Sequence, residues 1–281
     1  MTVIVRRLSV EDLPIAGVIL DAAYGPGERA ARLRRYLSLQ PDGWFLGLLD
    51  GEAVGLGGAL NYGACAYLGL MAVHPRAQRR GVARAVAERI LGWLDGAGCP
   101  SVLLDASPMG APLYASLGFA PDEESILFRR DPSRSLPEAR AVLAPLERRD
   151  LPEVTAFDAP VFGALRPAVL ASYCDDLAGR AWLLRNAEGV VEGYAFAQSA
   201  VIGPWAAIDA ARAETLLTAA FAVAYHEPPT VMIPSTNIAG VALLERQGFS
   251  PVRALLHMRR GGARPPGRRE QLFGRASFAI G

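Results

Sequence analysis

The sequence contains no lysine, because all 29 of its basic residues are arginine. This absence excludes Schiff-base chemistry on a lysine amine and a phosphate-binding loop with its usual lysine. Only three cysteines are present, Cys65, Cys99 and Cys174, far apart and without C-x-x-C spacing. We therefore expect neither a disulfide framework nor a thiolate zinc site, and a reducing compartment suits the chain.

A charge imbalance and long apolar runs are also lacking. The 29 basic and 28 acidic residues give a net charge of +1, which offers no general attraction to nucleic acid or to an anionic membrane. No stretch reaches the ~20 apolar residues of a membrane span, and the first residues lack the apolar core of a signal peptide. The three histidines are scattered. We expect a cytoplasmic protein without metal, nucleic acid or membrane partners.

Length and internal repetition indicate two domains. A chain of 281 residues, 51% of them hydrophobic, is long enough for two cores. The segment Asp131–Pro137 breaks all periodicity, so we predict domains over residues 1–133 and 140–281.

A weak repeat relates the two halves. The segment Gly240–Pro251 overlays Gly110–Pro121 without a gap and aligns Leu244 with Tyr114. Asp150-Leu151-Pro152 likewise repeats Asp12-Leu13-Pro14. Two matches in the same order indicate duplication of one fold, with chance matching of short motifs as the alternative.

Apolar periodicity in the first half predicts alternating strands and helices, typical of an α/β fold with a mixed sheet flanked by helices. The strand that precedes residue 74 and the strand that follows residue 100 are joined through a helix and are predicted to be parallel neighbours. The predicted strands are Val3–Leu8, Trp44–Leu49, Ala53–Asn61, Ala66–Val73 and Ser101–Asp105, and the predicted helices are Ser9–Ala23, Arg29–Leu37, Val82–Leu94 and Gly110–Leu117.

A short glycine-containing loop lies between a predicted strand and a predicted helix. Its Gln78-x-x-Gly81-x-Ala83 resembles the Q/R-x-x-G-x-G/A loop of the GNAT superfamily of N-acetyltransferases, which implies acetyl-CoA as cosubstrate. Free backbone N–H groups at a helix N-terminus would bind the pyrophosphate. Arg79 and Arg80 either add charge toward the phosphates or are solvated. The resemblance implies cofactor contacts from Leu70, Met71, Ala72, Val73, Gln78, Arg79, Arg80, Gly81, Val82 and Ala83.

A second motif follows. Ala111–Phe119 resembles the A-x-x-L-Y-x-x-x-G-F segment of the same family, which places a tyrosine beside the sulfur of CoA. Tyr114 is therefore the predicted general acid, because a hydroxyl within hydrogen-bond reach assists departure of a thiolate. The alternative is an ordinary packed tyrosine.

The resemblance implies a direct attack of a neutral amine on the thioester carbonyl, polarised by a backbone N–H of Leu70–Val73, with no acyl-enzyme. Asp105 is the candidate general base, with a turn or cap role as the alternative. Tyr24, Asn61 and Tyr62 are predicted to line the acceptor pocket, although surface turn residues have the same appearance.

The second half departs from the active pattern. Leu244 replaces the tyrosine, and no Q-x-x-G-x-G/A loop precedes the predicted helix Ala211–Ala224. This half resembles the degenerate GNAT-like domain fused behind bacterial YitH-type acetyltransferases, so we predict that it neither binds CoA in the usual way nor catalyses. It either covers the acceptor side, with residues such as Tyr194 or Asn237, or is purely structural or dimer-forming.

Two further segments of the second half carry expectations. Arg259–Arg269 is a basic, breaker-rich stretch and is expected to be a solvated loop. Leu272–Ile280 alternates in apolar character and is predicted to return as a strand.

The sequence thus predicts tandem GNAT folds and an N-acetyltransferase that acts on a primary amine of a small molecule in a ternary complex. A protein lysine or N-terminal acetyltransferase and a non-catalytic acyl-CoA sensor remain as alternatives. A tandem arrangement resembling mycothiol synthase would place the competent loop in the second half, whereas this sequence places it in the first. Acceptor identity, general base, acyl-chain preference and the choice between monomer and homodimer stay open.

Overall fold

The computed structural model describes residues 2–134, 143–262 and 267–281, and the first half folds as strands and helices close to those predicted. Predicted and observed boundaries agree within a few residues, except that Val10–Asp12 forms a 3-10 turn before the first helix. The elements are β1 (Val3–Arg7), α1 (Leu13–Tyr24), α2 (Arg29–Leu39), β2 (Trp44–Leu49), β3 (Glu52–Asn61), β4 (Ala66–Val73), α3 (Val82–Gly96), β5 (Ser101–Ala106), α4 (Ala111–Ser116) and β6 (Ala120–Arg130).

The second half repeats this order of elements. Both α4 and α8 are followed by a glycine in the left-handed region, Gly118 with φ +87° and Gly248 with φ +80°, and then by a long strand. The elements are β7 (Ala144–Pro145), α5 (Leu151–Phe162), α6 (Pro167–Asp176), β8 (Ala181–Arg185), β9 (Val191–Ala197), β10 (Ile202–Ala207), α7 (Ala210–Ala220), β11 (Thr230–Pro234), α8 (Ile238–Arg246), β12 (Phe249–Gly261) and β13 (Leu272–Gly274).

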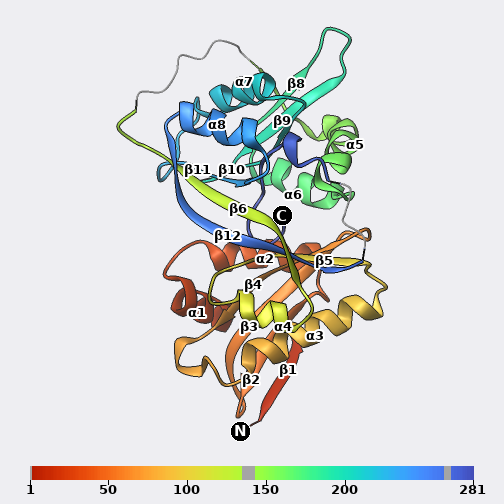
Figure 1. Cartoon of the computed structure of the whole chain (residues 1–281), viewed down its shortest axis with the longest axis vertical. Coiled ribbons are helices and arrows are strands. Elements are labelled where there is room, and N and C mark those ends of the chain that lie inside the picture. The colour runs from red at the N-terminus through yellow and green to blue at the C-terminus, as the bar shows by residue number, and fades with distance from the viewer. Residues whose placement is uncertain (1, 135–142, 263–266) are drawn as a thin grey trace.

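The two halves exchange their long strands. The larger sheet has the order β1-β2-β3-β4-β5-β12-β6-β11, so β12 of the second half lies between two strands of the first half. Conversely, β6 of the first half lies between β12 and β11, and all of these pairs are antiparallel. In Figure 1, β6 and β12 run side by side through the middle of the molecule, between the first-half helices below and the second-half helices above. The halves therefore share one continuous eight-stranded sheet.

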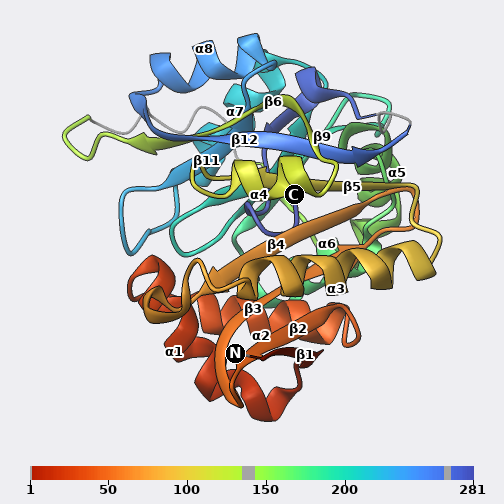
Figure 2. The ribbon, with the colours of Figure 1, turned by 60° about the horizontal axis from the view of Figure 1, so that its bottom comes forward.

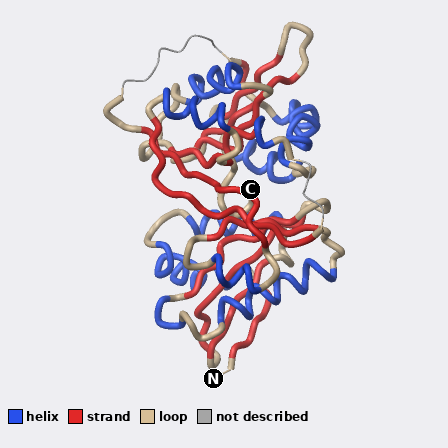
Figure 3. Tube along the Cα trace, viewed as in Figure 1, coloured by secondary structure: helices blue, strands red, loops and turns tan. Residues whose placement is uncertain are grey.

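A second sheet of five strands belongs to the second half, in the order β13-β10-β9-β8-β7. Figure 3 shows the strands of both sheets through the interior, with helices around them. The predicted fold class, a mixed sheet flanked by helices, is confirmed, whereas the exchange of strands was not predicted.

Opposite faces of the first-half sheet are covered by different elements. Helix α3 packs on one face through Val82, Val86, Ile90 and Leu94, all buried, and Figure 2 shows it crossing the strands with α4 beside it. Helices α1 and α2 cover the other face together with the C-terminal segment 275–281, whose apolar residues belong to the same core cluster. This segment brings second-half residues onto the first-half sheet.

Two sequence predictions for the second half differ from the structure, and the predicted domain boundary is not tested by it. The strand predicted over Leu272–Ile280 ends at Gly274, because the chain turns there to pack against β4. The predicted boundary between residues 133 and 140 falls mostly on residues 135–142, outside the described part, and so stays a prediction. Residues 263–266 of the basic stretch are also outside it, whereas Arg259 and Arg260 extend β12.

In the described part, the helices are all too short or too polar to cross a membrane.

The contact between the C-terminal segment and β4 should be visible in stability. A Cβ on Gly69 would lie 2.3 Å from the Cα and 2.4 Å from the carbonyl oxygen of Ala279. Gly69→Ala should therefore lower the free energy of unfolding by about 1–3 kcal/mol, measured by urea denaturation, because two backbone segments must separate. Gly92→Ala in the interior of α3 meets nothing within 4 Å and should be neutral or stabilising by up to about 1 kcal/mol. Equal effects at both positions would contradict the packing described.

Candidate functional site

Strands β4 and β5 of the first half are paired at one end and separate at the other. Their parallel ladder joins Ala66 to Val102 and Tyr67 to Leu103, although β4 continues to Val73 and β5 to Ala106. Beyond Tyr67 the two strands diverge, so the backbone of residues 69–73 presents its outer edge to a gap instead of to a neighbouring strand. A gap of this kind can accept an extended ligand that completes the hydrogen bonding of the strand.

An irregularity in β4 lies at this gap. Leu70 has φ +50°, a conformation that costs energy for a residue with a side chain, and the ladder with β3 shifts register beside it. The Tyr24 hydroxyl, at the end of α1, donates a hydrogen bond to the Met71 carbonyl oxygen. The bulge thus redirects the edge of β4, and a tyrosine from the first helix is fixed directly beside it.

The loop from β4 to α3 ends in a concave run of backbone. Arg79 has φ +58° and Gly81, the N-cap of α3, has φ +83°. The first intrahelical hydrogen bond runs from Ala85 N to Gly81 O at 3.0 Å, so the preceding amides of the first turn point out of the helix end. A Cβ on Gly81 would meet nothing within 4 Å. Residues Gln78–Ala83 therefore form an open, amide-lined cradle at the positive end of a 15-residue helix, suited to a phosphate group.

Charged side chains lie beside this cradle. Arg80 pairs with Asp50 at 3.8 Å and Arg76 pairs with Glu52. A cavity of about 300 Å³ is lined by residues from the β2–β3 hairpin and from this loop, namely Leu49, Asp50, Glu52, Val54, Arg76, Ala77 and Arg80. Arg79 and Arg80 are both part of the loop that forms the cradle. Their contacts with phosphate groups stay a prediction.

Tyr114 lies on α4, in the same core cluster as the buried residues of α3, with 7% of its surface exposed. It packs edge-on against Phe119, with ring centroids 5.8 Å apart. Burial raises the pKa of the Tyr114 hydroxyl, and Tyr24 contributes in the same direction. The hydroxyl is therefore fully protonated at neutral pH, as a proton donor must be. Tyr24 lies beside Met71 of β4, and α4 with Tyr114 follows β5, the other strand of the gap.

Asp105, the predicted general base, is enclosed in a buried cluster. Its Oδ1 accepts hydrogen bonds from the Ser125 hydroxyl at 2.6 Å and from His257 Nδ1 at 2.9 Å. Its Oδ2 accepts one from the Tyr67 hydroxyl, and its side chain is fully buried. Burial opposes ionisation, but His257, Arg275 and Ser125 outweigh it and lower the pKa of Asp105 to about 2. Its role as base stays a prediction, while these contacts favour a role as the anchor of the cluster.

The cluster joins residues from both halves. Burial and the charge of Arg275 lower the pKa of His257, so His257 is neutral at pH 7 and donates from Nδ1 to the ionised Asp105. Arg275 also pairs with Glu123 at 3.1 Å, and both side chains are 1% exposed. Because His257 and Arg275 belong to the second half, the floor of the gap is held together by charges from both halves.

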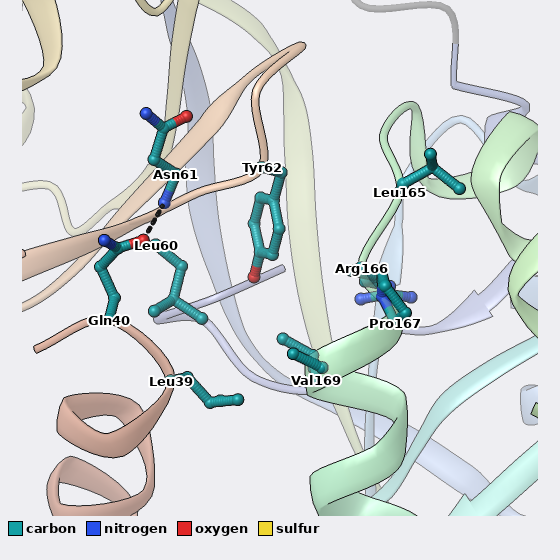
Figure 4. Close-up of a pocket in the computed structure, with 10 residues that line it drawn as sticks. Leu39, Gln40, Leu60, Asn61, Tyr62, Leu165, Arg166, Pro167 and Val169 are labelled. Atoms are coloured by element: carbon teal, nitrogen blue, oxygen red, sulfur yellow. Dashed lines mark hydrogen bonds between the residues drawn. The ribbon is translucent and has the colours of Figure 1, made fainter. Parts of the chain in front are cut away.

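Asn61 and Tyr62, predicted with Tyr24 to line one acceptor pocket, lie elsewhere. Asn61 ends β3 and Tyr62 follows it, at the paired end of the sheet, whereas Tyr24 lies beside Met71 at the open end. Figure 4 shows Tyr62 across from α6 and the loop before it, in a cavity of about 220 Å³ that Asn61 also lines. The cavity is lined by Leu39, Gln40, Leu60, Asn61, Tyr62, Leu165, Arg166, Pro167, Ala168 and Val169. Only Tyr24 of the three lies at the gap.

Tyr194 and Asn237, suggested as second-half contributors to the acceptor side, are core residues. Tyr194 is fully buried and donates a hydrogen bond to Asp158. Asn237 is 1% exposed, caps α8 through Gly240 N and donates to the Leu272 carbonyl oxygen. This expectation is corrected because both side chains satisfy internal partners.

In the second half, the counterpart of the gap is filled by the chain itself. Strand β13 pairs with β10 in antiparallel fashion, and Arg275 N donates to the Met232 carbonyl oxygen of β11 at 2.8 Å. The Phe273 ring lies 5.4 Å from the Trp205 ring. Segment 272–275 thus occupies the space between β10 and β11, as an extended ligand between β4 and β5 would.

The helix end that corresponds to the phosphate cradle is also closed. Helix α7 begins at Ala210, three residues after β10, and its N-cap Asp209 accepts a hydrogen bond from Arg212 N at 2.8 Å. A carboxylate at this position satisfies the helix amides and repels a second anion.

Two residues that contact the C-terminal segment or belong to it were not predicted as site residues. Arg253 on β12 and Phe278 in the C-terminal segment lie together, with the guanidinium 5.1 Å from the ring centroid. Their positions depend on the strand exchange and on the path of the last residues, neither of which has a local sequence signal.

Comparisons with known proteins agree with this geometry. A model of the acetyltransferase (GNAT) family matches residues 13–119 and a model of an acetyltransferase (GNAT) domain matches residues 154–274. A candidate acetyltransferase from Pyrococcus horikoshii is similar over 99% of this chain and 96% of its own, with 27% identity and a TM-score of 0.86. A GCN5-related N-acetyltransferase from Sphaerobacter thermophilus shares the fold over 94% and 98%, with 18% identity and a TM-score of 0.69. A comparison with curated proteins gave no match.

The low pKa of Asp105 predicts a pH dependence of stability. A folded-state pKa of about 2 against an ordinary value near ~3.9 means that the ionised form is bound more tightly in the folded state. The resulting stability, about 2 kcal/mol, is complete above about pH 5 and is lost as the pH falls toward 2. Asp105→Asn should reduce the free energy of unfolding at pH 6 and flatten its fall between pH 5 and 2.

Denaturant titrations at each pH measure this effect. Glu88→Gln, which removes an exposed pair with Arg84, is the control and should change stability by less than about 0.5 kcal/mol. An unchanged pH profile in Asp105→Asn would disprove the assigned charge state.

Proposed function

Because the chain is a tandem member of the GNAT acetyltransferase family, we propose that its first half binds acetyl-CoA and transfers the acetyl group to a primary amine of a small molecule. Three features of the first half carry the proposal. These are the separated strands β4 and β5, the open cradle at Gly81 and the buried Tyr114 hydroxyl. The three features match the three parts of a thioester nucleotide. The cradle suits its pyrophosphate, the strand edge its amide-containing chain and the hydroxyl its sulfur.

The residues present fit such a ligand. The cradle is open at Gly81, where a Cβ would have no atom within 4 Å, and its amides suit the pyrophosphate. The strand edge at residues 69–73 suits an extended, amide-containing chain. Together these features would direct the far end of the ligand toward the bulge at Leu70.

The chemistry proposed is direct transfer in a ternary complex. Acetyl-CoA, when bound, supplies a thioester carbonyl for attack by a neutral amine and a sulfur that leaves as thiolate. Backbone N–H groups of Leu70–Val73 would orient and polarise the carbonyl oxygen. Tyr114 would donate its phenolic proton to the departing sulfur, and the proton lost by the amine nitrogen as it becomes an amide would pass through solvent and restore the Tyr114 hydroxyl. Asp105, with its three hydrogen-bond donors, would position β4, β5 and β12 around the gap.

We assign no acetyl transfer to the second half. Its gap is filled by segment 272–275, its helix end is capped by Asp209, and Leu244 replaces the tyrosine. This half contributes β12 and the C-terminal segment to the first, which supports a role in building the acceptor side.

Binding at the cradle is tested with two glutamate substitutions at opposite ends of α3. Gly81 and Gly98 both have positive φ, +83° and +68°, and open space beyond Cα. Gly81→Glu places a carboxylate on the cradle and should weaken CoA binding at least about a hundredfold by calorimetry, through charge repulsion and obstruction. Gly98→Glu carries the same backbone strain and should bind as the wild type does. Equal affinities in the two variants would place the CoA site elsewhere.

The role of Tyr114 is tested by removing only its hydroxyl. Tyr114→Phe should lower kcat for acetyl transfer by about 10²-fold or more, with little change in CoA affinity, because general acid catalysis contributes that range. Tyr225→Phe removes a hydroxyl that donates to Ala220 O in the second half and should leave kcat unchanged. Full activity in Tyr114→Phe would remove this assignment.

Two alternatives have distinct outcomes. CoA binding that depends on Gly81 without turnover on any amine would favour an acyl-CoA sensor. Transfer to peptides but not to free small amines would favour a protein acetyltransferase.

A further inference from the structure

Four side chains are linked by contacts to residues 69–71 of β4. Arg29 stacks on Tyr24, which hydrogen-bonds to Met71. Arg253 stacks on Phe278, whose neighbour Ala279 lies against Gly69. The four side chains come from three separate parts of the chain: Tyr24 and Arg29 from α1 and α2, Arg253 from β12 and Phe278 from the C-terminal segment. We call these four residues the acceptor mouth. Tyr24 connects the acceptor mouth to the bulge in β4, because its hydroxyl donates a hydrogen bond to the Met71 carbonyl oxygen.

The first arginine is held against this tyrosine. The guanidinium of Arg29 lies 5.3 Å from the centroid of the Tyr24 ring. Its Nη1 donates a hydrogen bond to the Gly25 carbonyl oxygen at 2.9 Å. These two contacts fix one cation on the α1–α2 side of the mouth and leave further donors of the guanidinium for a ligand.

The second arginine, Arg253, belongs to the exchanged strand β12. The ladder of β12 with β5 begins at Leu256, opposite Ala106, so Arg253 lies beyond the end of β5. There its guanidinium stacks on Phe278 at 5.1 Å. Stacking on an aromatic ring orients a guanidinium while leaving its N–H edge available.

Neither cation is neutralised by a carboxylate. In the described part of the chain, no ion pair within 4.0 Å involves Arg29 or Arg253, whereas Arg35, Arg166 and Arg185 are all paired. The pKa of Arg29 is lowered by burial and by the charges of Arg32 and Arg253, while Tyr24 and Asp21 act in the opposite direction. The backbone of Ala279, next to Phe278, lies against Gly69, two residues from the Met71 carbonyl oxygen that accepts from Tyr24. The contacts of both arginines therefore lead to the same stretch of β4.

This charge is unfavourable for a simple amine. An aliphatic amine is mostly protonated at neutral pH and is repelled by two arginines that form no ion pair within 4.0 Å with the described residues. A carboxylate on the same acceptor molecule turns this repulsion into attraction. Arginine and carboxylate form short, charge-assisted and often bidentate hydrogen bonds. The attraction would hold the carboxylate at the mouth and direct the amine inward, past Tyr24, to the bulge.

We propose that the acceptor is a small primary amine that also carries a carboxylate, and that Arg253 with Arg29 recognises this carboxylate. The inference rests on the proposed acetyl transfer and narrows its acceptor to one chemical class. Arg253 and Arg29 are binding residues in it, and Phe278 orients Arg253.

Acceptors that differ only in the carboxylate test this directly. Phenylalanine is compared with 2-phenylethylamine, and 5-aminopentanoate with pentylamine, by following thiol release from acetyl-CoA. In at least one pair the carboxylated amine should have a kcat/KM at least about tenfold higher, as a charge-assisted contact provides. Arg253→Gln and Arg29→Gln should each reduce this preference through KM. Arg34→Gln, an exposed arginine elsewhere on α2, should not.

A binding measurement separates this inference from acetyl transfer itself. The N-acetylated forms of all four acceptors are titrated by calorimetry into the CoA-saturated protein. Preferential binding of carboxylated forms, lost in Arg253→Gln, supports the inference even if no turnover is seen, in which case the proposed enzymatic function fails alone. Equal binding and equal turnover within both pairs, or a preference unchanged by both substitutions, overturn the inference and leave acetyl transfer standing.

Discussion

The antiparallel pairing of β6 with β12 is the interaction on which the rest of the molecule depends. It joins the long strands of the two halves over most of their length, from Phe249 opposite Arg130 to Arg259 opposite Ala120. Because each strand also pairs with the other half's sheet, neither half closes its sheet alone. Strand exchange of this kind usually links separate protomers, and here the duplicated halves achieve it within one chain.

The strand exchange buries charged residues where the two halves meet. The free-energy cost of burying each charge has to be offset by a partner of opposite charge. Asp105 and Glu123 of the first half face Arg275 and His257 of the second, and these side chains are buried. Burying an unpaired charge is very costly, whereas a paired and hydrogen-bonded cluster is tolerated and fixes one arrangement. The cluster therefore specifies the register of β5, β12 and β6, and through β5 it sets where the gap beside β4 opens.

Local features of the first half could be read from the sequence, because each has a short-range cause. Apolar periodicity located α3, and the Gln78-x-x-Gly81-x-Ala83 motif before this helix marked the loop that forms the cradle. The position of Tyr114 followed from a motif whose spacing fits one short helix. Long-range features could not be read in this way. The path of β12, the filling of the second gap by segment 272–275 and the separation of Asn61 and Tyr62 from Tyr24 all depend on contacts between residues far apart in sequence.

The two halves show how one fold can serve two purposes after duplication. In the first half, the space between the separated strands stays open and the helix end is free of carboxylate. In the second, the chain's own residues take both positions, with β13 beside β10 and Asp209 on α7. The last strand of the second half fills the gap of its own half, and the residues that follow it pack against β4 of the first half. The same C-terminal stretch therefore closes one gap and lines the other, and Arg253 of the exchanged strand β12 stacks on its Phe278.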